Sequence, residues 1–127
     1  GFSEKEVRVH LDEIIEFSEL GDFIDQPVRT YSSGMYSKLA FSVTAILETD
    51  IMLIDEVLSV GDEHFKKKSY AKMKELIAGK ERTVVIVSHS LGTLQELCDR
   101  IMWMHDGIIK EIGRPKEVLE HYKEFMK

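Results

Sequence analysis

The sequence predicts an α/β fold in which a helical part precedes a mainly parallel sheet with flanking helices and a C-terminal β-hairpin. Two short apolar runs, at 51–55 and 83–88, are typical of strands buried on both faces of a parallel sheet. A stretch with apolar residues at helical spacing separates them, and strands that alternate with helices favour a parallel sheet. Further on, Asp106 and Gly107 join two apolar runs and predict a hairpin turn.

The first part of the chain is predicted to be helical. Ser3 and Glu6 form a capping-box pair, and apolar residues then recur at helical spacing over 4–19. A short helical or turn segment at 20–25 ends before Pro27, because the residue that precedes a proline avoids the α region. We expect a loop at 28–33 and a second amphipathic helix over 34–48.

The second part adds strands and shorter helices. Asp62 is expected to cap a helix that ends at Gly79, and a short helix is expected over 91–97. The apolar runs at 100–105 and 108–112 form the predicted hairpin. Pro115 suits the first turn of a final helix, which carries its apolar residues on one side: Val118, Leu119, Tyr122 and Phe125.

The length of 127 residues fits one domain or part of one. No apolar run approaches the roughly 20 residues that span a bilayer, and no signal peptide is visible. The chain begins with Gly rather than Met, which suggests a processed, tagged or excised fragment. The single Cys98 excludes an internal disulfide and fits a reducing compartment, and its apolar neighbours predict a buried structural thiol.

The formal net charge of −6 argues against a nucleic-acid-binding surface. Residues 1–50 hold 10 acidic and 4 basic side chains, whereas residues 51–127 hold 13 of each. The acidic excess therefore belongs to the first part of the chain, which supports a two-part organisation. A basic run at 66–68 is expected to lie on a solvated helix face.

Polar residues follow both predicted strands and also precede a predicted helix. Asp55 and Glu56 end the first strand, and His89 follows the second. Two carboxylates at a strand end can serve a metal ion and a water molecule, or can simply be solvated acids. The loop at 31–35 precedes a helix N-terminus, where exposed backbone N–H groups and the helix dipole favour an anion.

Together these motifs resemble those of the ATP-binding subunit of an ABC transporter, a P-loop NTPase. Tyr-Ser-Ser-Gly-Met at 31–35 is similar to the signature loop, which is usually Leu-Ser-Gly-Gly-Gln. Residues 51–56 are similar to the Walker B strand with its catalytic glutamate, 59–62 to the D-loop, and 88–89 to the switch-histidine loop. The four motifs occur in the family's order over nearly the whole chain.

The variant forms of these motifs are similar to one branch of the family. Tyr-Ser-Ser-Gly-Met at 31–35 and Asp-Glu-Val-Leu-Ser-Val-Gly-Asp at 55–62 resemble the subunits that export polysaccharides, teichoic acids and O-antigens. Most importers carry Asp-Glu-Pro where this chain has Asp-Glu-Val at 55–57. The resemblance therefore implies an ATPase that powers export of a cell-surface polymer.

The resemblance also implies roles for single residues, with ATP and Mg²⁺ as cofactors. Asp55 would hold Mg²⁺ through a water, because Mg²⁺ keeps several of its waters in proteins. Glu56 would act as the general base toward the attacking water. His89 would contact the γ-phosphate and orient that water.

The signature loop and the D-loop are implied to act on the nucleotide across a homodimer interface. The nucleotide-binding residues of the loop would be Tyr31, Ser32, Ser33, Gly34 and Met35. Within it, Ser32 and Gly34 would bind the γ-phosphate of an ATP held mainly by the partner subunit. Ser33 stands where glycine is usual, and Met35 cannot make the hydrogen bonds of the usual glutamine. Asp62 would cross the interface and couple the two sites.

The phosphate-binding P-loop of the family is absent from these 127 residues. Its pattern is Gly-x-x-x-x-Gly-Lys-[Ser/Thr], whereas the one Gly-Lys pair here, Gly79-Lys80, is followed by Glu81 and lacks the earlier glycine. The chain thus resembles the C-terminal part of the subunit. We expect 1–48 to belong to the helical signature subdomain and 49–127 to the C-terminal half of the ATPase core. The chain alone is expected to be inactive.

The implied partners are a second copy of the ATPase subunit and a membrane-spanning permease, with no nucleic acid. The implied location is peripheral, at the cytoplasmic face of the cell membrane. The acidic region 1–33 would face the permease, although a solvated acidic helix explains its charge equally well.

Other function classes fit less well. A soluble ABC-type ATPase of DNA repair or translation predicts basic patches or inserted arms, which the sequence lacks. A non-enzymatic adaptor that keeps only the dimer-facing loops remains an alternative. The five scattered histidines and one cysteine lack the spacing of a zinc site. A serine hydrolase built on residues 88–90 would need a nucleophile elbow, which is missing.

Overall fold

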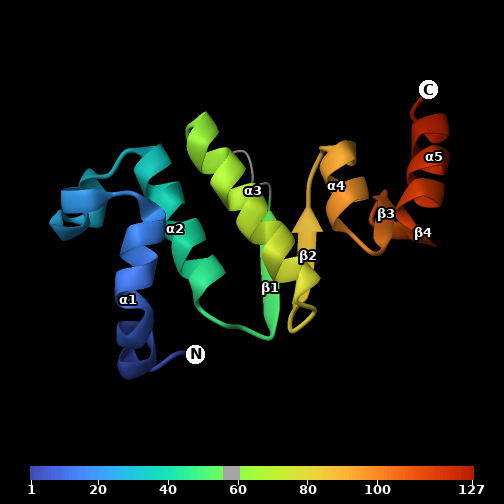
Figure 1. Ribbon diagram of the computed structural model, residues 1–127. Helices are drawn as coiled ribbons and strands as arrows, with labels where there is room; N and C mark the ends of the chain where they lie inside the picture. The colour runs from blue at the N-terminus through green and yellow to red at the C-terminus, as the bar shows by residue number, and fades with distance from the viewer. Residues whose placement is uncertain (56–60) are drawn as a thin grey trace. The chain divides into compact units, whose positions relative to one another are not determined.

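A computed structural model describes residues 1–55 and 61–127, and the fold is α/β as the sequence predicts (Figure 1). Contacts divide the chain into two compact units, Gly1–Val85 and Ile86–Lys127. The first unit contains α1 (Glu4–Ser18), the 3₁₀ helices η1 (Gly21–Asp25) and η2 (Val28–Thr30), α2 (Ser33–Ile46), β1 (Ile51–Asp55) and α3 (Glu63–Ala78). The second contains α4 (Leu91–Leu97), β3 (Ile101–His105), β4 (Ile108–Gly113) and α5 (Pro115–Phe125). Strand β2 (Thr83–Val87) begins in the first unit and ends in the second. The division at 48/49 into two domains stays a prediction.

Side-chain caps fix the starts of the helices in the first unit. The capping box of α1 is confirmed, because Ser3 Oγ accepts from the Glu6 N–H and the Glu6 carboxylate accepts from the Ser3 N–H. Ser32 caps α2, and Asp62 caps α3 as predicted. The segment 28–30, which was expected to be loop, forms the single 3₁₀ turn η2.

Three aromatic rings, one from each long helix, form the centre of the first unit. Phe17 of α1, Phe41 of α2 and Phe65 of α3 have ring centroids 5.9–6.2 Å apart in every pairing. Such offset and edge-on pairs contribute about 0.5–1.5 kcal/mol beyond the area that they bury. The triangle of rings therefore ties α1 and α2 to the start of α3.

Strand β1 is buried on one face only, so the prediction of a strand buried on both faces is wrong for the described residues. Met52 and Ile54 are buried, whereas Ile51 and Leu53 are 62% and 72% exposed. Successive side chains of a strand point to opposite faces, and the described residues cover only one of these. Strand β2, also expected to be buried, alternates between exposed and half-buried residues.

Strands β1 and β2 form a two-stranded sheet. The N–H of Thr83, which begins β2, donates to the carbonyl of Asp50, just before β1. The two strands thus start side by side and run in the same direction (Figure 1). With α3 between them in the chain, they form the parallel β-α-β unit that the sequence predicts.

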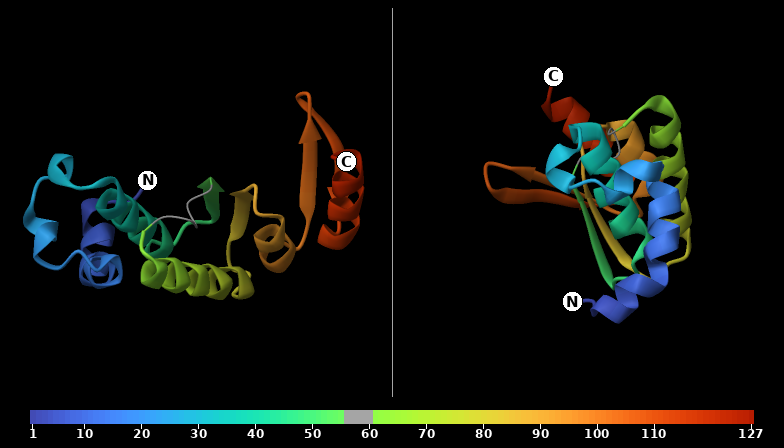
Figure 2. Two further views of the ribbon diagram at one scale, coloured as in Figure 1. Left: turned by 90° about the horizontal axis from the view of Figure 1, so that it is seen from above. Right: turned by 90° about the vertical axis from the view of Figure 1, so that its left-hand side faces the viewer.

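The C-terminal hairpin is confirmed. Strand β3 pairs with β4 in antiparallel register, and the turn residues Asp106 and Gly107 have φ of 49° and 74°. Positive φ at both central residues is what a type I′ turn requires. Helix α5 lies against the hairpin (Figure 2), with Val118 and Leu119 packed on Ile101.

Helix α3 ends at Gly79 as predicted, although Gly79 does not adopt the left-handed conformation that often terminates a helix. Gly79 keeps helical angles, with φ −64°, and its N–H still bonds to the Glu75 carbonyl. The left-handed residue is Lys80, with φ 51°.

No helix in the described ranges has the length and apolar character that crossing a bilayer demands.

Candidate functional site

An open pocket of about 510 Å³ lies at the N-termini of α2 and α3 in the first unit. Residues of two separate sequence motifs and of the helix between them line it: Ser32, Ser33, Gly34, Met35, Ser37, Lys38, Gly61 and Asp62. The structure thus brings together Asp62 and four of the five residues of the 31–35 loop, which the resemblance assigns to the D-loop and the signature loop.

The wall formed by α2 presents the polar start of a helix. Ser32 Oγ accepts the N–H of Met35 at 3.2 Å, which leaves the hydroxyl proton of Ser32 available for donation. Ser33 and Gly34 follow as the first two helical residues, whose N–H groups have no acceptor within their own helix. This wall can therefore donate several hydrogen bonds to an anion.

Gly34 is not required by the fold of the chain itself. Its φ is not positive, and a Cβ built there would meet only Ser32 Oγ, at 4.0 Å. Glycine lowers helix stability relative to alanine. A glycine with room for a side chain, at the mouth of a polar pocket, is consistent with a group that approaches the backbone closely.

The opposite wall is organised by the carboxylate of Asp62, whose two oxygens have different partners. Oδ1 accepts the N–H of Phe65 at 2.8 Å and caps α3, while Oδ2 accepts from Lys38 Nζ at 3.0 Å. The hydrogen bond from the Phe65 backbone, followed by that from Lys38, lowers the pKa of Asp62 below its usual range. The carboxylate is thus held charged at the pocket wall.

Gly61, unlike Gly34, is required by the fold. Its φ is +91°, and a Cβ there would lie 3.3 Å from the Cβ of Phe65 and 3.5 Å from Cε of Lys38. Only glycine combines that backbone angle with such close neighbours. The turn before α3 is therefore packed directly against the aromatic centre of the unit.

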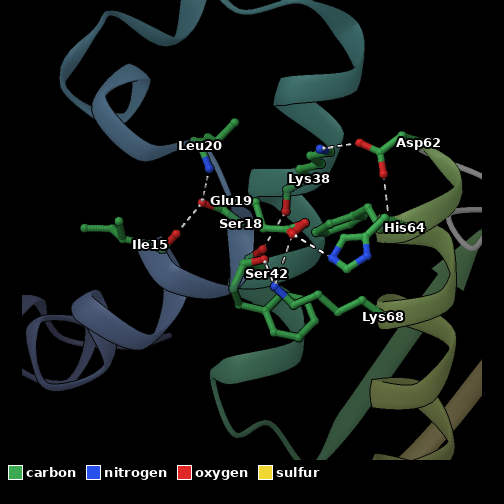
Figure 3. A network of polar contacts seen from close by, with 11 residues as sticks. Ile15, Ser18, Glu19, Leu20, Lys38, Ser42, Asp62, His64 and Lys68 are labelled. Atoms are coloured by element: carbon green, nitrogen blue, oxygen red, sulfur yellow. Dashed lines mark hydrogen bonds and ion pairs between the residues drawn. The ribbon is translucent and has the colours of Figure 1, made fainter.

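A polar network joins the end of α1 to α3 (Figure 3). Lys68 Nζ donates to the carbonyl of Phe17 at 2.7 Å and lies 3.8 Å from Glu19 Oε2. His64 Nε2 lies 3.3 Å from the same carboxylate oxygen. The prediction that the basic run 66–68 is only a solvated face is therefore wrong for Lys68, which is a structural contact between helices.

The remaining predicted site residues lie elsewhere. Tyr31 precedes the pocket, and its hydroxyl donates to the carbonyl of Phe23 at 2.9 Å, so it anchors the loop to η1. Asp55 is the exposed last residue of β1. His89 is exposed, follows β2 and belongs to the second unit. Glu56 lies outside the described residues.

The carboxylate of Asp55 could bind Mg²⁺ only together with other ligands. Within residues 1–55 and 61–127, no three His, Cys, Asp or Glu side chains gather as a metal site would require. Mg²⁺ is commonly held by one or two carboxylates together with waters and substrate phosphates. A single exposed carboxylate at a strand end fits that mode of binding.

Lys38 is the charged pocket residue that sequence reasoning missed, and Ser37 of the same helix was missed with it. Lys38 follows Gly34 by four positions, a spacing that places two helical residues on one face. That spacing, at the start of a helix predicted to bind an anion, was the available signal. Its partner Asp62 is 24 residues away, and no local pattern announces such a pairing.

Comparison with known proteins gives close relatives over the full chain, although no protein-family model matches it. The chain is 52% identical to an O-antigen export system ATP-binding protein of Myxococcus xanthus, over 98% of the chain and 28% of that protein. It is 51% identical to a teichoic acids export ATP-binding protein of Lactococcus lactis, over 99% of the chain and 27% of that protein. The chain therefore spans about a quarter of the length of these two relatives.

Solved structures share the fold at lower identity. An ATP-binding subunit of an ABC transporter matches with a TM-score of 0.80 and 23% identity, over 97% of this chain and 51% of that one. A dimeric ATP-binding cassette bound to ADP and phosphate matches with a TM-score of 0.70 and 22% identity, over 91% and 50%. The predicted fold, part of an ABC-type P-loop NTPase domain, is confirmed.

Proposed function

Because this chain belongs to the family of ABC-type ATP-binding proteins that includes those of O-antigen and teichoic acid export, we propose that it forms part of an ATP-hydrolysing export motor. The exported material would be a cell-surface polysaccharide, teichoic acid or O-antigen. The observation that carries the proposal is the pocket in which the signature loop and Asp62 meet. The full motor would work at the cytoplasmic face of the membrane with a permease, and without nucleic acid.

The pocket would receive the γ-phosphate of an ATP held by a second copy of the subunit. The Ser32 hydroxyl and the backbone N–H groups of Ser33 and Gly34 are suitable donors, and the dipole of α2 favours negative charge at this end. Met35 contributes its N–H to the cap of α2 rather than a side-chain amide to the phosphate. A structural neighbour that is dimeric and bound to ADP and phosphate is in keeping with a second copy of the subunit and with a nucleotide.

Hydrolysis would use the residues at the strand ends. Asp55 would hold Mg²⁺, which when bound neutralises charge on the phosphates. Glu56 would take a proton from the attacking water, and His89 would donate a hydrogen bond to the γ-phosphate. These three roles rest on the resemblance of the motifs and on the exposed position of Asp55 at the end of β1.

The 127-residue chain alone should neither bind ATP tightly nor hydrolyse it. Phosphoryl transfer depends on positioning by a P-loop together with the metal, and the P-loop pattern is absent from this sequence. The Asp62 wall and the α2 wall would supply only the side of the site that faces the partner's nucleotide.

The test is phosphate release by the full-length protein that contains this chain, with the variants Glu56→Gln and Glu63→Gln. Loss of a general base should lower the rate by about 100-fold or more, whereas Glu63, a surface residue of α3, should tolerate its change. An active Glu56→Gln variant would overturn the catalytic assignment. Micromolar binding of Mg·ATP to the isolated chain, measured by calorimetry, would overturn the proposal that this chain supplies only one side of the nucleotide site. A full-length protein without ATPase activity would favour the adaptor.

A further inference from the structure

Lys38 is the cation that joins the two walls of the pocket. It lies on α2, a turn beyond the signature loop, and its ammonium contacts the Asp62 carboxylate at the start of α3 at 3.0 Å. The side chain of Lys38 is 17% exposed, whereas that of Asp62 is 60% exposed. The ammonium also lies 5.3 Å from the centroid of the Phe65 ring. The Lys38 ammonium is thus held between a carboxylate and an aromatic ring, while Asp62 faces solvent.

We propose that Lys38 is a positioning residue for ATP hydrolysis, which fixes the Asp62 carboxylate to the helix that carries the signature loop. The inference rests on the proposed function. This ion pair would keep the distance between the α2 wall and the Asp62 wall constant when a partner subunit and its nucleotide bind. Without it, Asp62 retains its capping bond to Phe65 but loses its link to α2.

The geometry favours positioning over direct contact with phosphate. The charge of Lys38 is already balanced by Asp62, and its stem is enclosed by Gly61 and Phe65. To reach a phosphate, the ammonium would have to leave both the carboxylate and the ring. The hydroxyl and N–H donors at Ser32–Gly34 need no such exchange.

Two substitutions separate the ion pair from the rest of the structure. Lys38→Met removes the charge and keeps an unbranched apolar stem over Phe65. Asp62→Ser removes the charge and keeps an oxygen that can cap α3. In the full-length protein, each should lower kcat of the ATPase about tenfold with KM for ATP within twofold, because small misplacements of a reacting geometry cost about that much or more. The double variant should be no slower than either single variant, and Lys38→Arg should restore most of kcat.

Lys68→Met is the matched control. Lys68 also lies over the aromatic triangle and also pairs with a carboxylate, but it does not line the pocket. The Lys68→Met variant should have a lower unfolding temperature than wild type and an unchanged kcat. A KM that rises with kcat unchanged in Lys38→Met would assign Lys38 to direct phosphate binding and overturn the inference, as would a kcat within twofold of wild type.

A structural readout separates this inference from the proposed function. In ¹³C NMR titrations, Lys38→Met should raise the pKa of Asp62 and Lys68→Met should not. An unchanged Asp62 pKa in Lys38→Met overturns the ion pair whatever the ATPase does. A wild-type protein without ATPase activity overturns the proposed function and the inference together, whereas a Lys38→Met variant whose kcat stays within twofold of an active wild type overturns the inference alone.

Discussion

Lys68 donates a 2.7 Å hydrogen bond to the main-chain carbonyl of Phe17, a residue 51 positions earlier in the chain. Phe17 lies in the last turn of α1, where the carbonyl groups find no N–H donor within the helix. A cation at this end also complements the helix dipole. Lys68 of α3 therefore caps the C-terminus of α1, next to Glu19, which has a left-handed backbone conformation.

Replacing Lys68 by Met should destabilise the first unit. The variant keeps the apolar stem but leaves a half-buried carbonyl unpaired, so the free energy of unfolding should fall by about 1.5–3 kcal/mol, the usual range for a hydrogen bond to a charged group. Urea unfolding followed by circular dichroism measures the change. The neighbouring Lys67 is exposed, and Lys67→Met should stay within about 0.5 kcal/mol of wild type. Equal losses in both variants would contradict the cap.

Gly34 and Gly61 should respond oppositely to alanine. Gly61→Ala forces a positive φ on a residue with a Cβ and crowds Phe65, so it should cost about 1–3 kcal/mol. Gly34→Ala meets only Ser32 Oγ, at an ordinary contact distance of 4.0 Å, and should be neutral or stabilise the helix by up to about 1 kcal/mol. Thermal unfolding compares the two, with phosphate release by the full-length protein measured in parallel. The stable Gly34→Ala protein should nevertheless lose ATPase activity; full activity would mean that no phosphate approaches this backbone.

The second unit should lose stability as the pH rises from 6 to 8. His121 Nδ1 lies 2.9 Å from a Glu111 carboxylate oxygen, and this hydrogen bond raises the pKa of His121 above 6.5. A raised folded-state pKa means that the stabilising charge is fully present below the unfolded-state value and is lost as the pH rises through the folded-state value. Urea midpoints at the two pH values test the direction. Glu111→Gln should flatten the dependence, and Glu117→Gln, a weaker contributor, should change it less.

Cys98 should react slowly with iodoacetamide at neutral pH. Burial, followed by the charge of Asp99, raises the pKa of the thiol above 9.0, and only the thiolate is the nucleophile. Unfolding in urea should accelerate the reaction, and Asp99→Asn should accelerate it slightly in the folded protein. A folded-state rate equal to that in urea would show that the thiol is not packed against the buried cluster of Ile101, Val118 and Leu119.

Local signals in the sequence predicted most of the elements. Capping boxes, turn pairs and helical spacing act over a few residues, which is why Ser3, Asp62 and the Asp106-Gly107 turn stand where they were expected. The end of α3 at Gly79 is also where the sequence predicts it, but the left-handed residue that follows is Lys80, for which the sequence carries no signal.

Burial and long-range pairing could not be predicted in the same way. The apolar run in β1 predicts a strand buried on both faces, yet burial depends on what covers each face and not on the strand's own residues. Cys98 is half-buried for the same reason. The contacts of Lys38 with Asp62 and of Lys68 with Phe17 join segments whose separation in sequence carries no periodic signal.

The two oxygens of the Asp62 carboxylate have different partners, and this restricts which residues can replace Asp62 among relatives. Serine, threonine or asparagine could cap α3 but could not balance the charge of Lys38, and glutamate could balance the charge but is a poor cap. A change at 62 that keeps the cap should therefore be accompanied by loss of the lysine at 38. An alignment of relatives should show these two positions changing together, while 67 varies independently of both.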